Sequence, residues 1–234
     1  IPLSPTQHGF RPHHSTTTLL TNTTQNIQDG INSKRPAKRT LLLTIDISKA
    51  FDAIPRLPLI NKIYNTTLHN NTKRWLANYL SGRQAFVHYN GKSSQTLLFP
   101  NGVPQGSVLS PTLFNLYMHD IPEPPPHIQI ASYADDITIT SKHNNADVCT
   151  AQAQTYLDTV SHWLTSNRLK VAPTKSTCTL LTNYSKEHQY RPNITLNNTT
   201  IPHTRGTYTW RHLQHFHDLR PPHKQNHKLG KQQT

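Results

Sequence analysis

The chain has 234 residues, enough for one large domain or two lobes around a sizeable buried core. Its 24 Lys and Arg residues outnumber 11 Asp and Glu residues, and the formal charge of +13 indicates a polyanionic partner, with nucleic acid the first candidate. No segment approaches the roughly 18 consecutive apolar residues of a membrane span and no signal peptide is recognisable, which favours a soluble, intracellular protein without a membrane partner.

The cysteines and the N-terminus add two expectations. Cys149 and Cys178 lack the C-x-x-C spacing of a metal or redox site, so free thiols in a reducing compartment are expected. The chain begins with Ile1 and contains a single methionine, Met118. We therefore expect an internal piece of a longer protein.

The first predicted helix follows a Gly-Phe-Arg-Pro turn at residues 9–12. Ser15 is the expected N-cap of a helix over residues 16–28, which Asp29-Gly30 would stop. A basic loop over residues 32–40 comes next. This loop is either solvated or in contact with a phosphate backbone, and the sequence does not favour one interpretation over the other.

The apolar run Leu41-Leu42-Leu43-Thr44-Ile45 predicts a short buried strand that ends in Asp46. An acid directly after a strand is often a metal ligand. Lys49 and Asp52 are expected in the following turn. Phe51 would point into the space that Asp46 borders, or would simply belong to the core.

The next 50 residues predict two helices and a hairpin. Helices are expected over 59–65 and 72–80, where Trp75, Leu76, Tyr79 and Leu80 follow the helical period and indicate a core-facing stripe. Strands are expected over 85–89 and 95–99, joined by Asn90-Gly91, whose residues tolerate positive φ.

A Gly/Pro-rich loop over residues 101–111 precedes a helix predicted over 112–119. Its glycines allow the backbone to approach a ligand closely, and the Gln105 amide offers both a donor and an acceptor. Ser110-Pro111 opens the helix, because proline is tolerated in a first turn. Alone, such a loop is a weak signal.

Two adjacent carboxylates, Asp135 and Asp136, lie between apolar, β-branched runs over residues 130–139. This pattern predicts a β-hairpin with acids at its tip. Like charges so close repel each other unless they share a cation, and carboxylate oxygens are preferred ligands of Mg²⁺. A solvated acidic turn is the alternative.

A long helix is predicted over 144–167, and strands are predicted over 167–171 and 177–181. Lys175 lies in the turn between these strands. Taken alone, it is more simply solvated than bound to a phosphate.

Taken together, these motifs resemble the reverse transcriptases of non-LTR (LINE-type) retrotransposons. The resemblance covers residues 7 to about 200, and its combination of motifs is highly specific. The matching segments are residues 7–15, 45–52, 102–116, 133–136 and 169–181.

The resemblance implies an α+β fold: the fingers and palm of a right-hand polymerase, with an antiparallel palm sheet and no thumb in this chain. The implied activity is that of an RNA-directed DNA polymerase. It would use an RNA template, a DNA primer supplied by nicked target DNA, and dNTPs, in the cytoplasm and nucleus. The oligomeric state remains open.

The resemblance also implies roles for particular residues. Asp46, Asp135 and Asp136 would be the catalytic carboxylates that hold two Mg²⁺ ions. Phe51 would be a steric gate against the 2′-hydroxyl, and Gln105 and Gly106 would border the nascent base pair and template. Lys175 would reach the triphosphate, as would Arg11. His13-His14 stand where the family usually has Gly-Arg, so one fixed positive charge is lost near Arg11.

The end of the chain departs from the family, which normally continues with Tyr-Leu-Gly where this chain has Tyr208-Thr209-Trp210. Reading the codons after Tyr208 one base later permits Leu-Gly-Val-Thr-Phe-Asn. We therefore expect residues 1–208 to be a partial fingers and palm, and residues 209–234 to be an out-of-frame or disordered tail. An uninterrupted frame in independent copies of the transcript would contradict this expectation.

Two further interpretations compete with an active reverse transcriptase. One is a decayed, inactive copy that at most binds RNA non-specifically through its charge. The other is an RNA-dependent RNA polymerase, which Phe51 at the gate position argues against.

Overall fold

A central antiparallel sheet organises the chain. The computed structural model describes residues 3–33, 36–187 and 189–204. Within these residues the sheet has the strand order β6-β7-β1-β8, and every neighbouring pair is antiparallel. The strands are β6 (Ile128–Tyr133), β7 (Asp136–His143), β1 (Arg39–Asp46) and β8 (Thr177–Leu181). Their many β-branched residues suit a pleated, half-buried surface.

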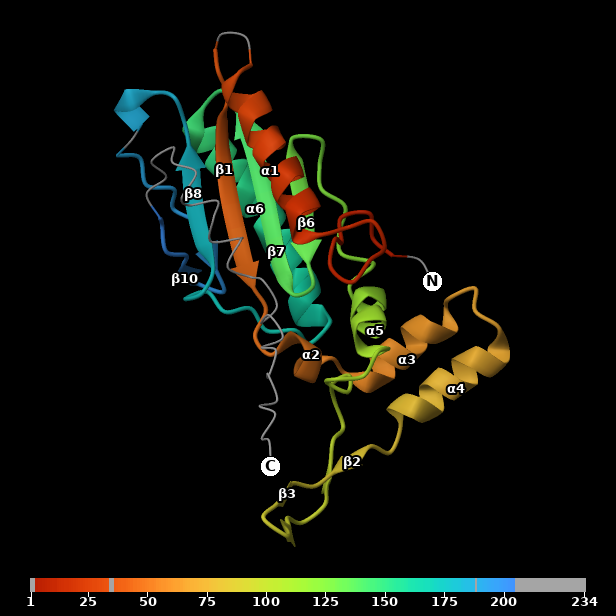
Figure 1. The fold of residues 1–234 in the computed structure, drawn as a ribbon. Helices are drawn as coiled ribbons and strands as arrows, with labels where there is room; N and C mark the ends of the chain where they lie inside the picture. The colour runs from red at the N-terminus through yellow and green to blue at the C-terminus, as the bar shows by residue number, and fades with distance from the viewer. Residues whose placement is uncertain (1–2, 34–35, 188, 205–234) are drawn as a thin grey trace, which may run out of the picture.

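Two helices cover opposite faces of this sheet. Figure 1 shows α1 (Thr16–Ile31) in front of the sheet and α6 (Ala146–Ser166) behind it. Asn26 of α1 donates from Nδ2 to Thr140 Oγ1 of β7 over 2.7 Å, which ties α1 to its face. Because strand residues alternate between faces, the neighbours of Thr140 along β7 turn toward α6.

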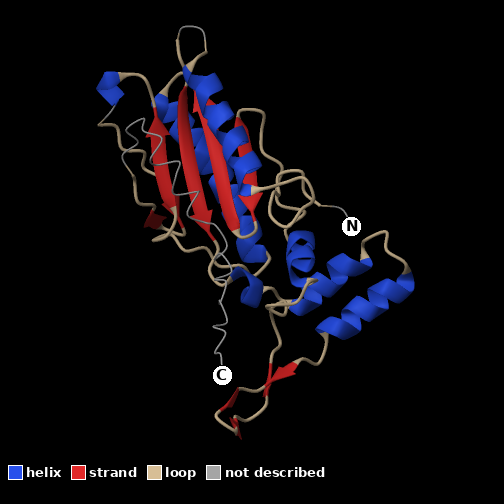
Figure 2. Cartoon of the chain, viewed as in Figure 1, coloured by secondary structure: helices blue, strands red, loops and turns tan. Residues whose placement is uncertain are grey.

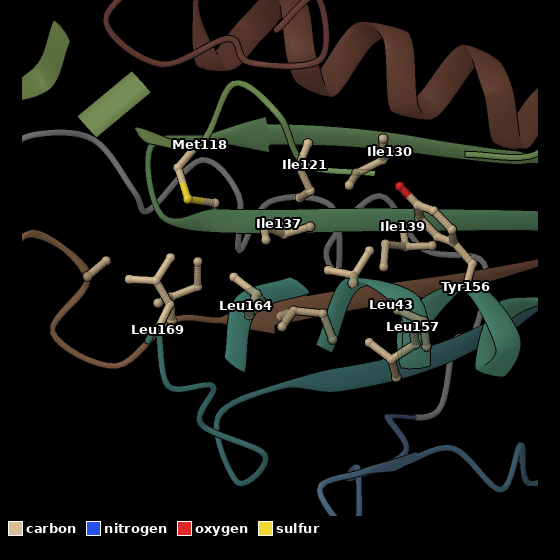
Figure 3. Packing of buried hydrophobic residues seen from close by; sticks show 14 of the residues in the cluster. Leu43, Met118, Ile121, Ile130, Ile137, Ile139, Tyr156, Leu157, Leu164 and Leu169 are labelled. Carbon is tan, nitrogen blue, oxygen red and sulfur yellow. The ribbon is translucent and has the colours of Figure 1, made fainter. Parts of the chain in front are cut away.

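The core lies mainly between the sheet and α6. Leu43 and Ile139 are directly opposite in the register of β1 and β7, as are Ile45 and Ile137. These side chains are almost completely buried, and Figure 3 shows Leu43, Ile137 and Ile139 close to residues of α6. Burying a large apolar side chain contributes about 1.5–3 kcal/mol, so this layer holds the two central strands in register.

The remaining elements lie at the end of the sheet where β1 finishes and at its β8 edge. The helices are α2 (Ala50–Ala53), α3 (Arg56–Tyr64), α4 (Asn70–Leu80) and α5 (Ser110–Tyr117). A ribbon made of the pairs β2 (Gln84–Ala85) with β5 (Leu97–Leu98) and β3 (His88–Tyr89) with β4 (Lys92–Ser93) stands away from the sheet (Figure 2). A 3₁₀ turn (Ser185–Glu187) and the hairpin of β9 (Thr195–Leu196) and β10 (Thr199–Thr200) complete the described chain.

Most predicted elements are present, and Ser15 caps α1 with a reciprocal hydrogen bond to Thr18. The predicted stop of this helix at Asp29-Gly30 is wrong, because α1 continues to Ile31. The reason is packing: a Cβ on Gly30 would lie 2.8 Å from Thr40 Oγ1. The glycine allows a close approach of helix to strand and does not end the helix.

Three further predictions need correction. Residues 167–171 do not form a strand, because Arg168 adopts a left-handed φ of 56° just after α6 and only Val171 forms an isolated bridge, with Ile47. Asp52 lies in α2 and not in a turn. Trp75 was expected in the core but is 56% exposed, whereas its neighbour Leu76 is buried.

The strands expected over 85–89 and 95–99 are interrupted and shorter than predicted, although Asn90 and Gly91 do form the tip with positive φ. Cys149 and Cys178 are free and buried, as expected. The boundary expected at residue 208, the tail 209–234, and Lys34 and Arg35 of the basic loop lie outside the described residues. In the described part of the chain, no helix combines the length and apolar character that a bilayer crossing requires.

Candidate active site

Three carboxylates meet at one end of the sheet. Asp46 is the last residue of β1 and lies directly opposite Asp136, the first residue of β7. Tyr133 pairs with Asp136, so Ala134 and Asp135 form a two-residue turn between β6 and β7. Directly opposite residues in antiparallel strands have their Cβ atoms about 4.5–5.5 Å apart on the same face. The fold thus brings together two segments that are some ninety residues apart in sequence.

The electrostatics of this cluster are unfavourable without a counter-charge. Burial, followed by the charges of Asp135 and Asp46, raises the pKa of Asp136 to about 6. Burial is also the main reason that the pKa of Asp135 is raised, with a further contribution from Asp46. The charged forms of Asp135 and Asp136 are therefore disfavoured by burial and by the neighbouring carboxylates.

Asp46 is fixed by the segment that leads into β8. Its backbone N–H donates to Ser176 Oγ over 3.3 Å, and its carbonyl accepts from the Ala172 N–H over 2.9 Å. Lys175, one residue before the buried Ser176, has its Nζ 4.0 Å from Asp46 Oδ2. Lys175 is 72% exposed, so solvent screens this pair strongly and the ammonium remains accessible.

The Asp46 carboxylate has an unsatisfied oxygen. Its Oδ2 atom is buried and has no hydrogen-bond partner among the described residues. Buried polar atoms are rarely left unpaired, and such an exception calls for an explanation. A hard cation next to Asp46, Asp135 and Asp136 would supply the missing partner. As the side chains stand, however, no group of three or more His, Cys, Asp or Glu residues in the described ranges is arranged to hold a metal ion.

Phe51 belongs to a cluster of three aromatic rings. Its ring is stacked on Phe114 of α5 with centroids 4.5 Å apart, and Phe10 meets it edge-on at 6.2 Å. Phe51 remains half-buried. Its stacking on Phe114 agrees with the core interpretation, whereas its expected place in the space that Asp46 borders remains a prediction.

The glycine-rich loop is held against α2. The Gly102 N–H donates to the Ile54 carbonyl over 2.7 Å and the Val103 N–H donates to the Phe51 carbonyl over 2.9 Å. Gly102 has φ 83°, and a Cβ there would lie 3.0 Å from the Asp52 backbone, so glycine is required. These two hydrogen bonds and the close approach at Gly102 fix the loop against α2.

Gln105 and Gly106 follow in the same loop. Gln105 is exposed, and its Nε2 donates to Asp52 Oδ1 over 2.8 Å. Gly106 has φ 83° and open space around it. The loop thus brings Gln105 to α2, the helix that carries Phe51, and the expected place of Gln105 and Gly106 beside the nascent base pair and template remains a prediction.

Arg11 is placed differently from the other predicted site residues. Its Nη1 donates to the Ser4 carbonyl over 2.8 Å, so in this structure it supports the N-terminal segment. Within the described residues, Arg11 forms no hydrogen bond or ion pair with the three carboxylates. Its expected reach to a triphosphate remains a prediction.

The sequence did not predict a site role for three residues. Asp52 binds Gln105. Gln7 and Asn115 are buried, and both contact the segment that packs against the acidic hairpin. Gln7 hydrogen-bonds to Ala134, and Asn115 hydrogen-bonds to Gly9. The signal for Gln7 was its position at the start of a segment matching the family. Asn115 carried no signal beyond its place in an otherwise apolar helix.

Comparison with known proteins agrees with this arrangement. The profile of the family described as reverse transcriptase (RNA-dependent DNA polymerase) matches residues 2–225. The RNA-directed DNA polymerase from mobile element jockey of Drosophila funebris is 28% identical over 205 residues, which are 85% of this chain and 22% of that protein. The probable RNA-directed DNA polymerase from transposon BS of Drosophila melanogaster is 31% identical over 177 residues, 73% of this chain and 19% of that protein. The chain therefore spans about a fifth of the length of these relatives.

Solved structures show the fold. Telomerase from Candida tropicalis, in an apo form truncated from the C-terminal domain, covers 77% of this chain and 37% of its own, with a TM-score of 0.53 at 15% identity. Telomerase from the same organism in complex with a TWJ fragment of telomeric RNA covers 88% of this chain and 34% of its own, with a TM-score of 0.58 at 11% identity. These likenesses support the expected mixed helix-and-sheet architecture built on an antiparallel sheet.

The match to the family spans nearly the whole chain, and the polymerases of mobile elements share its sequence over most of its length. The expected resemblance to reverse transcriptases of non-LTR retrotransposons is thereby confirmed. The chain belongs to the reverse transcriptase (RNA-dependent DNA polymerase) family.

Proposed function

We propose that the chain forms the fingers and palm of an RNA-directed DNA polymerase that joins dNTPs to a primer 3′-hydroxyl. The observation that carries this proposal is the pairing of Asp46 with Asp136 at the sheet end, with Asp135 in the adjoining turn. Three carboxylates from two strands suit the two-metal solution to phosphoryl transfer. The template would be RNA and the primer would be DNA, including nicked target DNA.

Asp46, Asp135 and Asp136 would hold two Mg²⁺ ions. The Oδ2 atom of Asp46, which accepts no hydrogen bond from the described residues, and the raised pKa of Asp136 both fit a cluster that binds cations. When bound, the ions would activate the attacking hydroxyl and stabilise the leaving oxygen. The protein's own contribution is to fix two anionic ligands, Asp46 and Asp136, on strand ends and the third, Asp135, in the tight turn beside them.

The surrounding residues would select and orient the nucleotide. Lys175, exposed and 4.0 Å from Asp46 Oδ2, would bind a phosphate of the incoming triphosphate. Phe51, supported from below by Phe114, would pack against the sugar and exclude a 2′-hydroxyl. Gln105 and Gly106 would border the nascent base pair, and Arg11 would assist at the triphosphate after leaving the Ser4 carbonyl.

Primer extension tests this proposal. The purified chain should extend oligo(dT) on poly(rA) with dTTP and Mg²⁺, and Asp135→Ala should reduce extension to background because one of three metal ligands is lost. Asp158→Asn, which changes an exposed carboxyl group on α6, is the matched control and should retain wild-type activity. Absence of extension by the wild type, or equal extension by Asp135→Ala, would reject the catalytic proposal for this chain.

Binding without catalysis is the second candidate. The formal charge of +13 favours it, because such a surface attracts any polyphosphate whether or not the carboxylates work. A decayed copy of the polymerase would show only this property.

A further inference from the structure

The turn of the acidic hairpin contains an unusual backbone conformation. Ala134, which precedes the Asp135-Asp136 pair, has φ 54° and is almost completely buried. Glycine or asparagine is the ordinary residue at such a position, because a Cβ disfavours the left-handed region. Surrounding contacts must therefore hold this turn in place.

One side chain satisfies both main-chain polar groups of Ala134. Gln7 Oε1 accepts from the Ala134 N–H over 3.0 Å, and Gln7 Nε2 donates to the Ala134 carbonyl over 3.1 Å. Gln7 is only 2% exposed, and its Oε1 also accepts from the Gly9 N–H over 2.8 Å. A planar amide that binds both groups fixes the orientation of the peptide units on either side of Ala134.

The segment that carries Gln7 is itself anchored on both sides. The His8 N–H donates to the Ser132 carbonyl over 2.7 Å and the Ser132 N–H donates to the Thr6 carbonyl over 2.8 Å, so the segment runs along β6. Asn115 Nδ2 of α5 donates to the Gly9 carbonyl over 2.8 Å. Gln7 is thus braced by both the sheet and the helix that supports Phe51.

Gly9 allows this approach. A Cβ at Gly9 would lie 2.4 Å from the Ala134 nitrogen, a distance that no side chain tolerates. The backbone at Gly9 therefore packs directly against the backbone at Ala134. This contact restricts movement of the hairpin tip away from Gln7.

We propose that Gln7 is a positioning residue for the acidic hairpin: its amide sets the turn at Ala134, and through that turn it orients Asp135 and Asp136. Gln7 itself is enclosed, and within the described residues its amide forms hydrogen bonds with Ala134 and Gly9 and none with the carboxylates. The expected effect of Gln7 on catalysis rests on the function proposed above. The effect of Gln7 on the conformation of the turn is inferred from the hydrogen bonds alone.

Gln7→Met tests the proposal, because methionine has nearly the same length and volume but cannot form these hydrogen bonds. Amide hydrogen exchange of Ala134, followed by NMR in the metal-free chain, should accelerate by about tenfold or more, while exchange in the centres of β1 and β7 stays near that of the wild type. In primer extension, kcat should fall by about 10- to 100-fold with a much smaller change in KM for dNTP.

Asn26→Leu is the matched control. It removes another buried amide that hydrogen-bonds to β7, at Thr140, away from the hairpin tip. We expect it to lower the melting temperature without accelerating exchange at Ala134 and without the selective loss of kcat. If Gln7→Met does not fold, Gln7→Asn replaces it, because the same amide on a side chain one methylene shorter cannot reach both groups of Ala134.

The outcomes separate the two proposals. Wild-type exchange at Ala134 in the folded Gln7 variant would overturn the positioning role, whatever the activity. Accelerated exchange together with unchanged kcat in an active enzyme would overturn its catalytic part. If the wild type shows no extension, the proposed function fails for this chain, and exchange at Ala134 still decides whether Gln7 holds the turn.

Discussion

Phe51 offers a direct test of nucleotide selection at the scale of a single residue. Its ring is fixed by stacking on Phe114, so it cannot turn aside easily for a bulkier sugar. We expect Phe51→Val to raise incorporation of rNTP relative to dNTP by on the order of tenfold or more, measured as the ratio of kcat/KM values.

The control for this substitution is Phe99→Val, which makes the same change at an exposed position on the ribbon. It should leave discrimination at the wild-type value. Because a ratio of two substrates is compared in one protein, any loss of folded protein cancels. Unchanged discrimination by Phe51→Val would mean that another group is the gate.

Asp136 gives the metal-free chain a specific pH dependence. Its pKa rises from an ordinary 3.8 to about 6 on folding, so the folded chain binds a proton more tightly than the unfolded chain does. This group therefore contributes stability at low pH that is lost as the pH rises through the window from about 4 to about 6. Between about pH 5 and about pH 7.5, the wild type should lose more free energy of unfolding than Asp136→Asn, as measured by urea denaturation without metal.

The comparison with Asp136→Asn is necessary because other groups titrate nearby. Burial lowers the pKa of His8, which gives a contribution of opposite sign, since protonation of the unfolded chain disfavours folding at low pH. That contribution is common to both proteins and cancels in the difference. Identical pH dependence of the two proteins would show that Asp136 is not perturbed.

At the scale of single residues, the positions of the three carboxylates in the fold were predicted correctly from the sequence. The residues that hydrogen-bond around the site were mostly not predicted. Asp46 was predicted at a strand end and Asp135-Asp136 at a hairpin tip, and the resemblance joined them into one site. Local patterns could not reveal that Gln105 binds Asp52, because that contact depends on how the glycine-rich loop folds back on α2. Gln7 begins a segment that matches the family, but its burial could not be predicted, because a glutamine is ordinarily exposed.

The N-cap of α6 allows a prediction at the scale of an element. Asn145 Oδ1 accepts from the backbone N–H groups of Asp147 and Val148 over 2.8 and 3.1 Å. Asn145→Ala should lower the free energy of unfolding by about 1 kcal/mol, because both donors lose their partner. Asn144→Ala, at the adjacent exposed position, should change it by less than about 0.5 kcal/mol. Equal effects in chemical denaturation would contradict the capping role.

Element types were predicted more reliably than element ends. The periodicity of apolar residues identified α1, α4, α5 and α6 and the strands of the central sheet, because each must bury one face. Ends depended on tertiary contacts. Gly30 is inside α1 because it packs on Thr40, and Trp75 is exposed although it follows the helical period, because α4 buries only a narrow stripe around Leu76 and Leu80.

For the whole molecule, charge predicts the manner of RNA binding. With a formal charge of +13, the chain should bind single-stranded RNA of unrelated sequences with similar affinity. Affinity should fall about 300-fold between about 50 and about 200 mM salt if about six phosphates of the single strand are neutralised. Fluorescence anisotropy with labelled RNA measures both effects, and affinity insensitive to salt would exclude charge as its source.

The same binding measurement separates the two candidate functions. A decayed copy would bind RNA in this way and extend no primer, whereas a functional polymerase would do both. Asp135→Ala should bind RNA at least as tightly as the wild type, since it removes a negative charge.

The register of β1 against β7 has a consequence for how such a chain can evolve. Asp46 and Asp136 share a face only because they are exact register partners, and side chains alternate with a period of two. Deleting one residue within either strand would send its acid to the opposite face of the sheet and its apolar residues out of the core. The loops in the connection between these strands carry no such constraint on phase, whereas β6, which pairs with β7, does. Insertions and deletions that preserve the site should therefore accumulate in those loops, whereas a single-codon insertion or deletion inside β1, β6 or β7 should be lethal to the site.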